Sequence, residues 1–366
     1  MQKLCSSFLA LLILLHCCFA QSHRKKNFTV TGYYAGNTTA IDSFEVDKLT
    51  HLIFSFCHLD GNRLSLGRAT DTIILQKMVS LRQKNHSLKI LVSLGGWGGC
   101  MTCSPVFSNA EGREEFARST KELLELFDIN GIDLDWEYPA IEGYPGHAYS
   151  PNDKANFTAL IKILRKTLGK KYEISFAAGG FNQFIDESVD WKEVMPKVDR
   201  VNLMSYDLIG GYSTVTGHHT ALYSNAVQSS STDNGVKLLL SKGVPANKIV
   251  IGAAFYARLF NVTDSSNNGL NQPGSFYRGV SYKNLYDTIN AANGFTQYRD
   301  AIAQAPYAFN PERKLFATYD DSISVKMKTK YAIRKKLNGI MFWQLMDDKF
   351  SNGLLNVINS SMRSKE

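Results

Sequence analysis

The sequence has few cysteines, no low-complexity tract and no repeat of solenoid period. With 44% hydrophobic residues among 366, this composition excludes intrinsic disorder and repeat arrays. No segment beyond the N-terminal region offers the roughly 20 uninterrupted apolar residues that a membrane span needs, so we expect no transmembrane helix. The net charge is +8, but the basic residues are not clustered with stacking aromatics, which excludes a nucleic-acid groove.

The first twenty residues have the features of a signal peptide. Lys3 precedes an apolar stretch over 8–19, and the small residue Ala20 precedes a polar run that begins at Gln21. We therefore expect residues 1–20 to be removed and 21–366 to be secreted and extracellular, or periplasmic or surface-attached in a bacterium. Six Asn-x-Ser/Thr sequences would accept glycans only in a eukaryotic secretory pathway: Asn27, Asn37, Asn85, Asn156, Asn261 and Asn359.

Three cysteines remain after removal of the signal peptide, namely Cys57, Cys100 and Cys103. They are too few for a disulfide-stapled scaffold, so a hydrophobic core must stabilise the fold. Cys100 and Cys103 form a CxxC sequence with no second pair nearby, which favours a small loop disulfide over a redox or metal half-site. Adjacent His218 and His219 have no ligand partners at metal spacing, and we interpret them as a solvated loop pair. We therefore expect no metal and no cofactor.

Eight short apolar segments, rich in β-branched and aromatic residues, are typical of strands buried on both faces of a parallel sheet. They lie at residues 28–34, 49–57, 88–95, 131–137, 172–178, 198–206, 249–256 and 339–345. Stretches of helical period separate most of them, at residues 72–83, 113–127, 152–168, 234–242 and 324–337. This α/β alternation predicts a (β/α)8 TIM barrel with its active site at the carboxyl ends of the strands. A doubly wound open sheet is disfavoured because no glycine-rich phosphate-binding sequence follows the first strand.

One long segment, residues 259–318, separates the seventh predicted strand from the helix before the eighth. A structureless loop of that length is uncommon in a compact domain. Its apolar content over 277–286 and 295–307 is sufficient for local structure. We therefore predict a small α+β insertion between strand seven and the last helices, forming one wall of a groove on the catalytic face.

The segment Asn130–Pro139 carries acids at three alternate positions, Asp133, Asp135 and Glu137. Side chains alternate along a strand, so the three acids share one face while the apolar residues between them take the other. Burying them together costs on the order of several kcal/mol unless protons are shared, so at least one proton should be retained at neutral pH. A structural ion-pair network or a solvated acidic strand is the alternative interpretation. Glu137 is nearest the strand's carboxyl end, which favours it as a general acid.

This segment resembles the DxxDxDxE signature of family-18 glycoside hydrolases, the chitinase family, with Asn130 in place of the first Asp. Four further matches occur in order at successive strand ends. Ser93–Trp97 is similar to the family's SxGG strand, and Met204–Asp207 to its MxYD motif. Tyr256–Arg258 is similar to its YxR motif, and Gly339–Trp343 to its final strand ending in Trp. The resemblance covers essentially all of the mature chain.

The resemblance implies cleavage of β-1,4 bonds in chitin or chitooligosaccharides by substrate-assisted catalysis through an oxazolinium intermediate. In this scheme Glu137 is the acid and base, and Asp135 stabilises the substrate's acetamido group. Asp133 holds a proton or exchanges it with Asp135. Tyr206 and Asp207 match acetamido-binding positions, although a packed strand end would also account for them. The resemblance further implies a substrate-binding role for Trp343, as a stacking floor, and for Trp97, Tyr33, Phe56, Met204, Tyr256, Arg258, Gly95 and Gly96. An ordinary turn explains the two glycines equally well.

Two other functions compete with a chitinase. One is a related hydrolase that cuts N-glycan cores or peptidoglycan, and the other is a chitinase-like lectin that binds glycans without cutting them. An intact Glu137 argues against the lectin, and the insertion over 259–318 favours a deep cleft for a linear polymer. The expected partner is chitin or a chitooligosaccharide, with no nucleic acid and no membrane span, and we expect a monomer.

Overall fold

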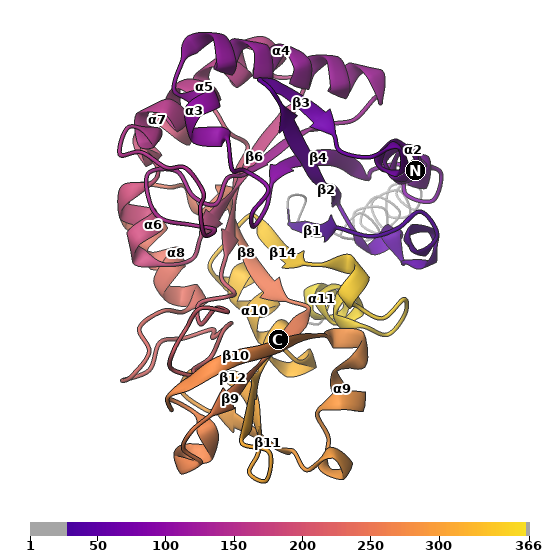
Figure 1. Cartoon of the computed structure of the whole chain (residues 1–366). Helices are drawn as coiled ribbons and strands as arrows, with labels where there is room; N and C mark the ends of the chain where they lie inside the picture. The colour runs from indigo at the N-terminus through magenta and orange to yellow at the C-terminus, as the bar shows by residue number, and fades with distance from the viewer. Residues whose placement is uncertain (1–27, 364–366) are drawn as a thin grey trace, which may run out of the picture.

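The computed structural model describes residues 28–363, so the predicted signal peptide lies outside the described residues. Within that range, eight parallel strands close into a barrel in which the last strand pairs with the first (Figure 1). In order around the barrel they are β1 (Thr29–Tyr34), β2 (His51–Asp60), β4 (Lys89–Gly95), β5 (Gly131–Asp135), β6 (Glu173–Gly179), β7 (Arg200–Met204), β8 (Ile249–Ala254) and β14 (Gly339–Trp343). All eight predicted strands are therefore confirmed, and the fold is a TIM barrel. A ninth strand, β3 (Arg63–Leu66), pairs antiparallel with β2.

Helices surround the barrel, and each of the five predicted helical stretches forms one of them. These are α2 (Ala69–Ser80), α4 (Ala110–Leu126), α5 (Asp153–Leu168), α8 (Thr232–Ser241) and α10 (Ser322–Arg334). Side-chain caps fix several starts, because Asn109, Ser231 and Asp321 each accept a backbone N–H of the first helical turn. Five other α-helices have four to ten residues, and short 3-10 helices also occur in the described chain. The five are α3 (Cys103–Phe107), α6 (Asn182–Glu187), α7 (Trp191–Val194), α9 (Leu285–Thr288) and α11 (Leu354–Arg363).

The two faces of the barrel strands have different roles. Outward-facing side chains pack against the helices, and among them Ile132, Leu134 and Trp136 are almost completely buried. Inward-facing side chains form a second cluster with one residue from each barrel strand except β5: Tyr33, Ile53, Leu91, Ala177, Met204, Val250 and Met341. Strand β5 instead directs Asp133 and Asp135 toward the interior. The predicted alternation of acids and apolar residues is thus confirmed.

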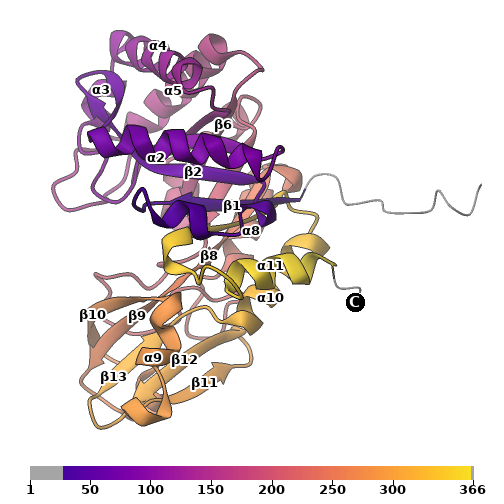
Figure 2. The same ribbon diagram turned by 90° about the vertical axis from the view of Figure 1, so that its right-hand side faces the viewer.

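The predicted insertion is present as a five-stranded antiparallel sheet with one short helix, α9. Its strands, in the order β10, β9, β13, β12 and β11, are Gly274–Ser281, Tyr256–Val262, Leu315–Thr318, Ala305–Asn310 and Thr296–Asp300. The sheet starts at Tyr256, before the predicted boundary at residue 259, because β8 ends at Ala254 and Phe255 stacks on Phe342 with ring centroids 4.0 Å apart. Figure 2 shows this sheet below the barrel, with α10 and α11 at the junction.

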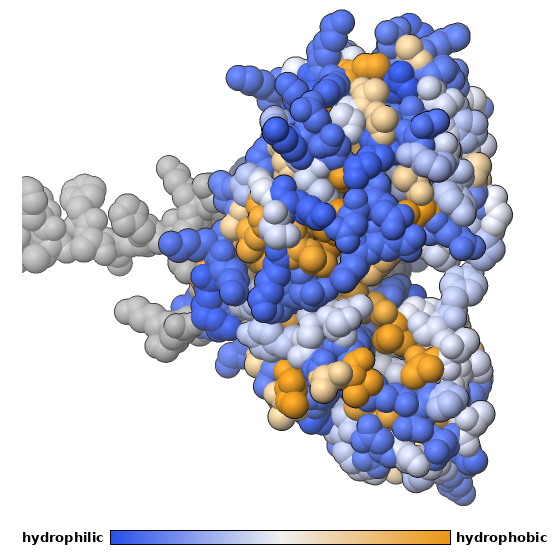
Figure 3. Space-filling model, turned by 90° about the vertical axis from the view of Figure 1, so that its left-hand side faces the viewer, coloured by the Kyte–Doolittle hydropathy of each residue, from blue (hydrophilic) through white to orange (hydrophobic). Residues whose placement is uncertain are grey.

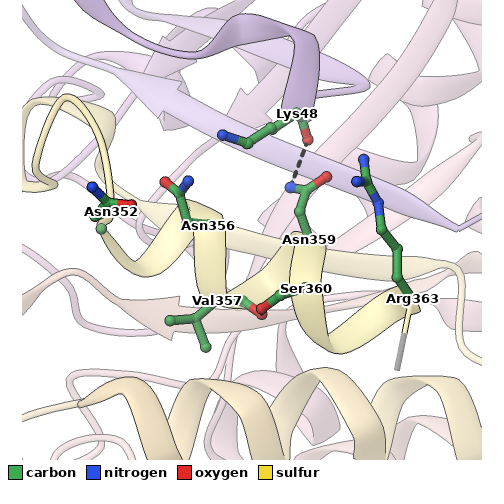
Figure 4. Close-up of a pocket in the computed structure, with 8 residues that line it drawn as sticks. Lys48, Asn352, Asn356, Val357, Asn359, Ser360 and Arg363 are labelled. Atoms are coloured by element: carbon green, nitrogen blue, oxygen red, sulfur yellow. Dashed lines mark hydrogen bonds between the residues drawn. The ribbon is translucent and has the colours of Figure 1, made fainter. Parts of the chain in front are cut away.

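Two sequence predictions outside the catalytic face have structural outcomes. Cys100 and Cys103 form a disulfide, as predicted, and Cys57 is buried. Asn359 lies on α11 at a polar hollow, where its amide donates to the Lys48 carbonyl at 3.0 Å (Figure 4). The Asn85 amide donates to two backbone carbonyls in the same way. A glycan on Asn85 or Asn359 would break these bonds, whereas Asn37 and Asn261 are exposed and Asn27 lies outside the described residues.

Candidate active site

A cavity of about 800 Å³ opens at the carboxyl ends of the barrel strands, between the barrel and the insertion. The outline of the molecule narrows between these two parts in the space-filling view (Figure 3). Ten residues selected from the sequence line the cavity: Phe56, Trp97, Asp135, Glu137, Met204, Tyr206, Asp207, Tyr256, Arg258 and Trp343. They come from segments far apart in the chain, which only the closed barrel brings together.

Asp133 lies below the cavity and is fully buried. One oxygen accepts hydrogen bonds from Tyr33 at 3.0 Å and Ser93 at 2.9 Å. The other accepts from Ser175 at 2.6 Å and Asn202 at 3.0 Å. Burial raises the pKa of Asp133, while the hydrogen bonds from the two serines, Tyr33 and Asn202 act to lower it. Four donors from β1, β4, β6 and β7 therefore fix this carboxyl group in one position.

Asp135 lies between Asp133 and the cavity, and it is only 4% exposed. Burial raises the pKa of Asp135 well above its usual range, and the charges of Glu137 and Asp133 raise it further. Its Oδ1 atom has no hydrogen-bond partner among the described residues. A buried carboxyl oxygen without a donor costs free energy, so this group retains a proton or binds a donor from a ligand in the cavity.

Glu137 follows the end of β5 and borders the cavity. The pKa of Glu137 is raised from its usual 4.5 to about 7, because burial and the nearby Asp207 charge raise it more than a hydrogen bond from Tyr138 lowers it. A carboxyl group of this kind carries a proton at neutral pH in about half of the molecules. The structure thus gives Glu137 the property that a general acid requires.

Asp207 lies across the cavity at the end of β7, with a backbone φ of 55°. Tyr256 donates its hydroxyl to Asp207 at 2.7 Å, and both Nε and Nη2 of Arg258 donate to it. Burial acts to raise the pKa of Asp207, but the hydrogen bonds and positive charge of Arg258 and the proximity of His219 hold it well below the usual range. Asp207 is therefore ionised, and its charge helps to keep the proton on Glu137.

Aromatic side chains form two surfaces of the cavity. Trp343 stacks on Phe56 with ring centroids 5.5 Å apart and an interplanar angle of 14°. Trp97 is 47% exposed. Its ring centroid lies 5.7 Å from that of Tyr144 and 6.1 Å from that of Tyr212. Exposed aromatic faces of this kind bind the C–H faces of sugar rings, because both surfaces are apolar and flat.

Three predicted substrate-binding residues lie outside the cavity wall. Tyr33 is only 2% exposed, and its hydroxyl contacts Asp133 instead of the cavity. A side chain at Gly95 would collide with the Asp135 carbonyl at 2.3 Å, and one at Gly96 would collide with the Phe56 ring. The glycines thus allow close packing behind the site, and Tyr33 supports Asp133 from below.

The interpretation of His218 and His219 as a solvated loop pair is wrong. Both side chains are at most 1% exposed, because the insertion packs over the segment that carries them. His218 contacts Asp300 at 3.1 Å, and His219 lies 3.5 Å from Asp207. Within residues 28–363, no group of three or more His, Cys, Asp or Glu side chains is arranged to hold a metal ion.

Several other lining residues were not selected from the sequence, among them Tyr138, Phe181, Tyr212, Phe276 and Asp347. For Tyr138, the only feature of the sequence that indicates a place in the cavity wall is its position directly after Glu137. The others lie in loops or in the insertion, where no periodic pattern indicates which side chains face the cavity.

A barrel whose carboxyl-end cavity combines a carboxyl group of raised pKa, a row of buried acids and flat aromatic surfaces has the arrangement of a glycoside hydrolase. Glycosyl hydrolases family 18 matches residues 29–348, and the chain belongs to this family. The family resemblance inferred from the sequence is thus confirmed.

Relatives and solved structures show the same affiliation. The chain is 33% identical to Chitinase A1 of Niallia circulans over 75% of its length and 31% identical to Chitotriosidase-1 of Mus musculus over 84%. The matches span 43% and 68% of those two proteins. A family 18 N-acetylglucosaminidase from Paenibacillus barengoltzii superposes with a TM-score of 0.83 at 35% identity, covering 92% of this chain and all of the other. No helix in the described part of the chain is long and apolar enough to cross a membrane.

Proposed function

We propose that this glycoside hydrolase cleaves β-1,4 bonds between N-acetylglucosamine units of chitin or chitooligosaccharides, with Glu137 as its acid and base. The main supporting observation is that Glu137, with its raised pKa of about 7, borders the cavity directly above the buried pair Asp135 and Asp133. Similarity to chitinases supports the proposal further, since Chitinase A1 is 33% identical and Chitotriosidase-1 is 31% identical to this chain.

The reaction begins with proton transfer from Glu137 to the glycosidic oxygen as the bond from that oxygen to the anomeric carbon breaks. The carbonyl oxygen of the sugar's own 2-acetamido group bonds to the same carbon and gives an oxazolinium intermediate. Glu137, now ionised, takes a proton from water while the water oxygen attacks the anomeric carbon and opens the oxazolinium ring. The enzyme therefore needs no nucleophile of its own.

Asp135 has the position and the free oxygen to accept the acetamido N–H and to stabilise positive charge on the intermediate. Its unpartnered Oδ1 atom supports this role, because a substrate donor would satisfy it. Asp133 cannot reach the cavity, but its four hydrogen bonds hold it where it can share a proton with Asp135. Tyr206 and Asp207, across the cavity, would contact the acetamido group.

The aromatic surfaces support a linear glycan as substrate. Trp343, on its Phe56 support, would lie beneath the sugar that is cleaved, and Trp97 would bind the neighbouring sugar. The insertion contributes Tyr256, Arg258 and Phe276 to the opposite wall, which makes the cavity a deep groove. Such a groove suits an extended polymer better than a branched glycan.

Hydrolysis of an N-acetylglucosamine hexamer, compared with release of glycans from an N-glycosylated protein, tests the proposal. We expect the hexamer to be cut and the glycoprotein to remain intact, with Glu137→Gln inactive on both. Release of N-glycans or of peptidoglycan fragments without cleavage of the hexamer would instead support the related hydrolase. Binding of the hexamer without cleavage by the wild-type protein would support a lectin.

The similarity to an N-acetylglucosaminidase favours one variant of this function, the release of single sugars. Product analysis of the same hexamer digest distinguishes an N-acetylglucosaminidase from a chitinase. Monomers from the earliest times would indicate an N-acetylglucosaminidase, and dimers or trimers a chitinase.

We also propose that the enzyme is secreted, on the basis of the signal-peptide features of residues 1–20. Expression of the full chain and of a variant lacking these residues, followed by activity assays of medium and cells, tests this proposal. Activity in the medium that requires residues 1–20 is the expected result, and equal export of both forms would contradict it.

A further inference from the structure

His219 lies beside Asp207 and does not line the cavity. Its side chain is completely buried, and its Nδ1 atom is 3.5 Å from Oδ1 of Asp207. Neither ring nitrogen has a hydrogen-bond partner of ordinary length among the described residues. Buried imidazoles normally make at least one hydrogen bond, so the direction of Nδ1 toward a carboxylate requires an explanation.

The position of His219 is fixed by its backbone. Its N–H donates to the Thr318 hydroxyl at 3.0 Å, and its carbonyl accepts the Leu208 N–H at 3.0 Å. The ring packs against Tyr256 with centroids 5.2 Å apart. These contacts hold the imidazole beside Asp207, whose side chain is 37% exposed and borders the cavity.

Asp207 has donors on one side only. Tyr256 and Arg258, both from β9, donate to it and pull the carboxylate toward the insertion. Nδ1 of His219 lies 3.5 Å from Oδ1, the same oxygen that Tyr256 and Nε of Arg258 contact, so a small rotation of the carboxylate brings this nitrogen within hydrogen-bond distance with or without a substrate. Hydrogen bonds at active sites are often long without substrate and shorten when it binds.

We propose that His219 is a positioning residue, whose Nδ1–H donates to Asp207 and holds this carboxylate in its substrate-contacting position beside Glu137. The inference rests on the proposed function, because it assigns to Asp207 a contact with the acetamido group. His219 does not touch the substrate itself, since Asp207 and Tyr256 separate it from the cavity.

Burial favours the neutral form of the His219 ring. Burial lowers the pKa of His219, and the positive charge of Arg258 lowers it further, while Asp207 and Asp320 act in the opposite direction. Asp320 is itself neutralised by the buried Lys328 at 2.6 Å. A neutral imidazole has a single N–H, and Oδ1 of Asp207 lies 3.5 Å from Nδ1.

Two polar variants test whether the N–H at the Nδ1 position matters. Asparagine places its side-chain nitrogen near the position of Nδ1, whereas glutamine extends to that of Nε2. His219→Asn should therefore retain the contact with Asp207, and His219→Gln should lose it. Because both are uncharged amides, their effects on folding should be similar. His218→Gln is the matched control, since His218 is equally buried but contacts Asp300.

The first measurement follows the titration of Glu137 in the unliganded protein by NMR of carboxyl-labelled glutamate, with Glu137→Gln to assign the signal. In His219→Gln the Asp207 charge is free to move away from Glu137, so the Glu137 pKa should fall by about half a unit. The His219→Asn and His218→Gln proteins should titrate like the wild type.

The second measurement is kcat/KM on the N-acetylglucosamine hexamer. We expect a roughly tenfold loss in His219→Gln, with an alkaline limb at lower pH, and a loss of less than about twofold in His219→Asn. In proteins that carry Asp207→Asn, adding His219→Gln should cause no further loss of kcat/KM, because the histidine acts through that carboxylate.

Equal losses in His219→Asn and His219→Gln, or a loss of activity without any change in the titration of Glu137, would show that the ring only fills space and would overturn the inference. Failure of the proposed function is a separate outcome, because it would appear as no hydrolysis by the wild type. The NMR titration needs no substrate and decides the inference in that case also.

Discussion

The structure makes a direct prediction about the alkaline limb of the pH profile, which is the fall in kcat/KM at high pH. A rise in the Glu137 pKa from 4.5 to about 7 corresponds to roughly 3 kcal/mol against its ionised form. Since only the protonated form can donate to the leaving group, kcat/KM should fall about tenfold for each pH unit above 7.

Asp207→Asn perturbs this limb without touching Glu137. The substitution removes a negative charge that raises the pKa of Glu137 and leaves the Arg258 charge without its partner. Both effects favour the ionised form of Glu137, so the limb should move to lower pH by about one unit. The matched control is Glu193→Gln, which breaks only a surface pair with Lys162 and should leave the limb in place.

The assay is the initial rate of hexamer cleavage at low substrate concentration, across the pH range in which the protein remains folded. An alkaline limb of the wild type near pH 4.5, or a limb that does not move in Asp207→Asn, would refute the reasoning. Loss of binding alone would reduce the rate equally at every pH and would not shift the limb.

Three further predictions concern stability, stacking and the substrate. Burial and Arg200 lower the pKa of His51 to about 4 from 6.5, so the folded protein binds fewer protons than the unfolded chain between these values. Stability should therefore fall by about 3 kcal/mol as pH decreases through this window. Denaturant unfolding should show the loss, with a shallower pH dependence in His51→Gln, and an unchanged slope would contradict it. Trp343→Ala should reduce kcat/KM on the hexamer at least tenfold, or about 1.4 kcal/mol, and a wild-type value would exclude it as the stacking floor. Fully deacetylated oligomers should not be cleaved, since they lack the internal nucleophile, and efficient cleavage detected by product analysis would contradict the mechanism.

The barrel was predictable because its strands are buried on both faces. Such strands appear as continuous apolar runs, and β5 was additionally marked by the alternation of Asp133, Asp135 and Glu137 with apolar residues. Asn130 also has a clear role at the start of this strand, since its side-chain oxygen accepts the Ile90 N–H at 2.8 Å. Local chemistry was sufficient for these features.

The predictions that failed depend on contacts between distant segments. His218 and His219 look like loop residues in the sequence, but both are buried against the insertion. His219 contacts Thr318 and Tyr256, and His218 contacts Asp300 and Tyr307. Tyr33 ends an apolar run in the same way as a cleft residue would, but the register of β1 directs it toward Asp133. No pattern in the surrounding residues indicates either outcome.

The central claim is that Glu137 carries the proton that breaks the glycosidic bond, and hydrolysis of the N-acetylglucosamine hexamer by Glu137→Gln tests it most directly. The amide has nearly the same shape but cannot transfer the proton, so the rate should fall by about a hundredfold to ten-thousandfold. Hexamer affinity, measured by calorimetry, should stay close to that of the wild type. Cleavage by Glu137→Gln at the wild-type rate would contradict the claim.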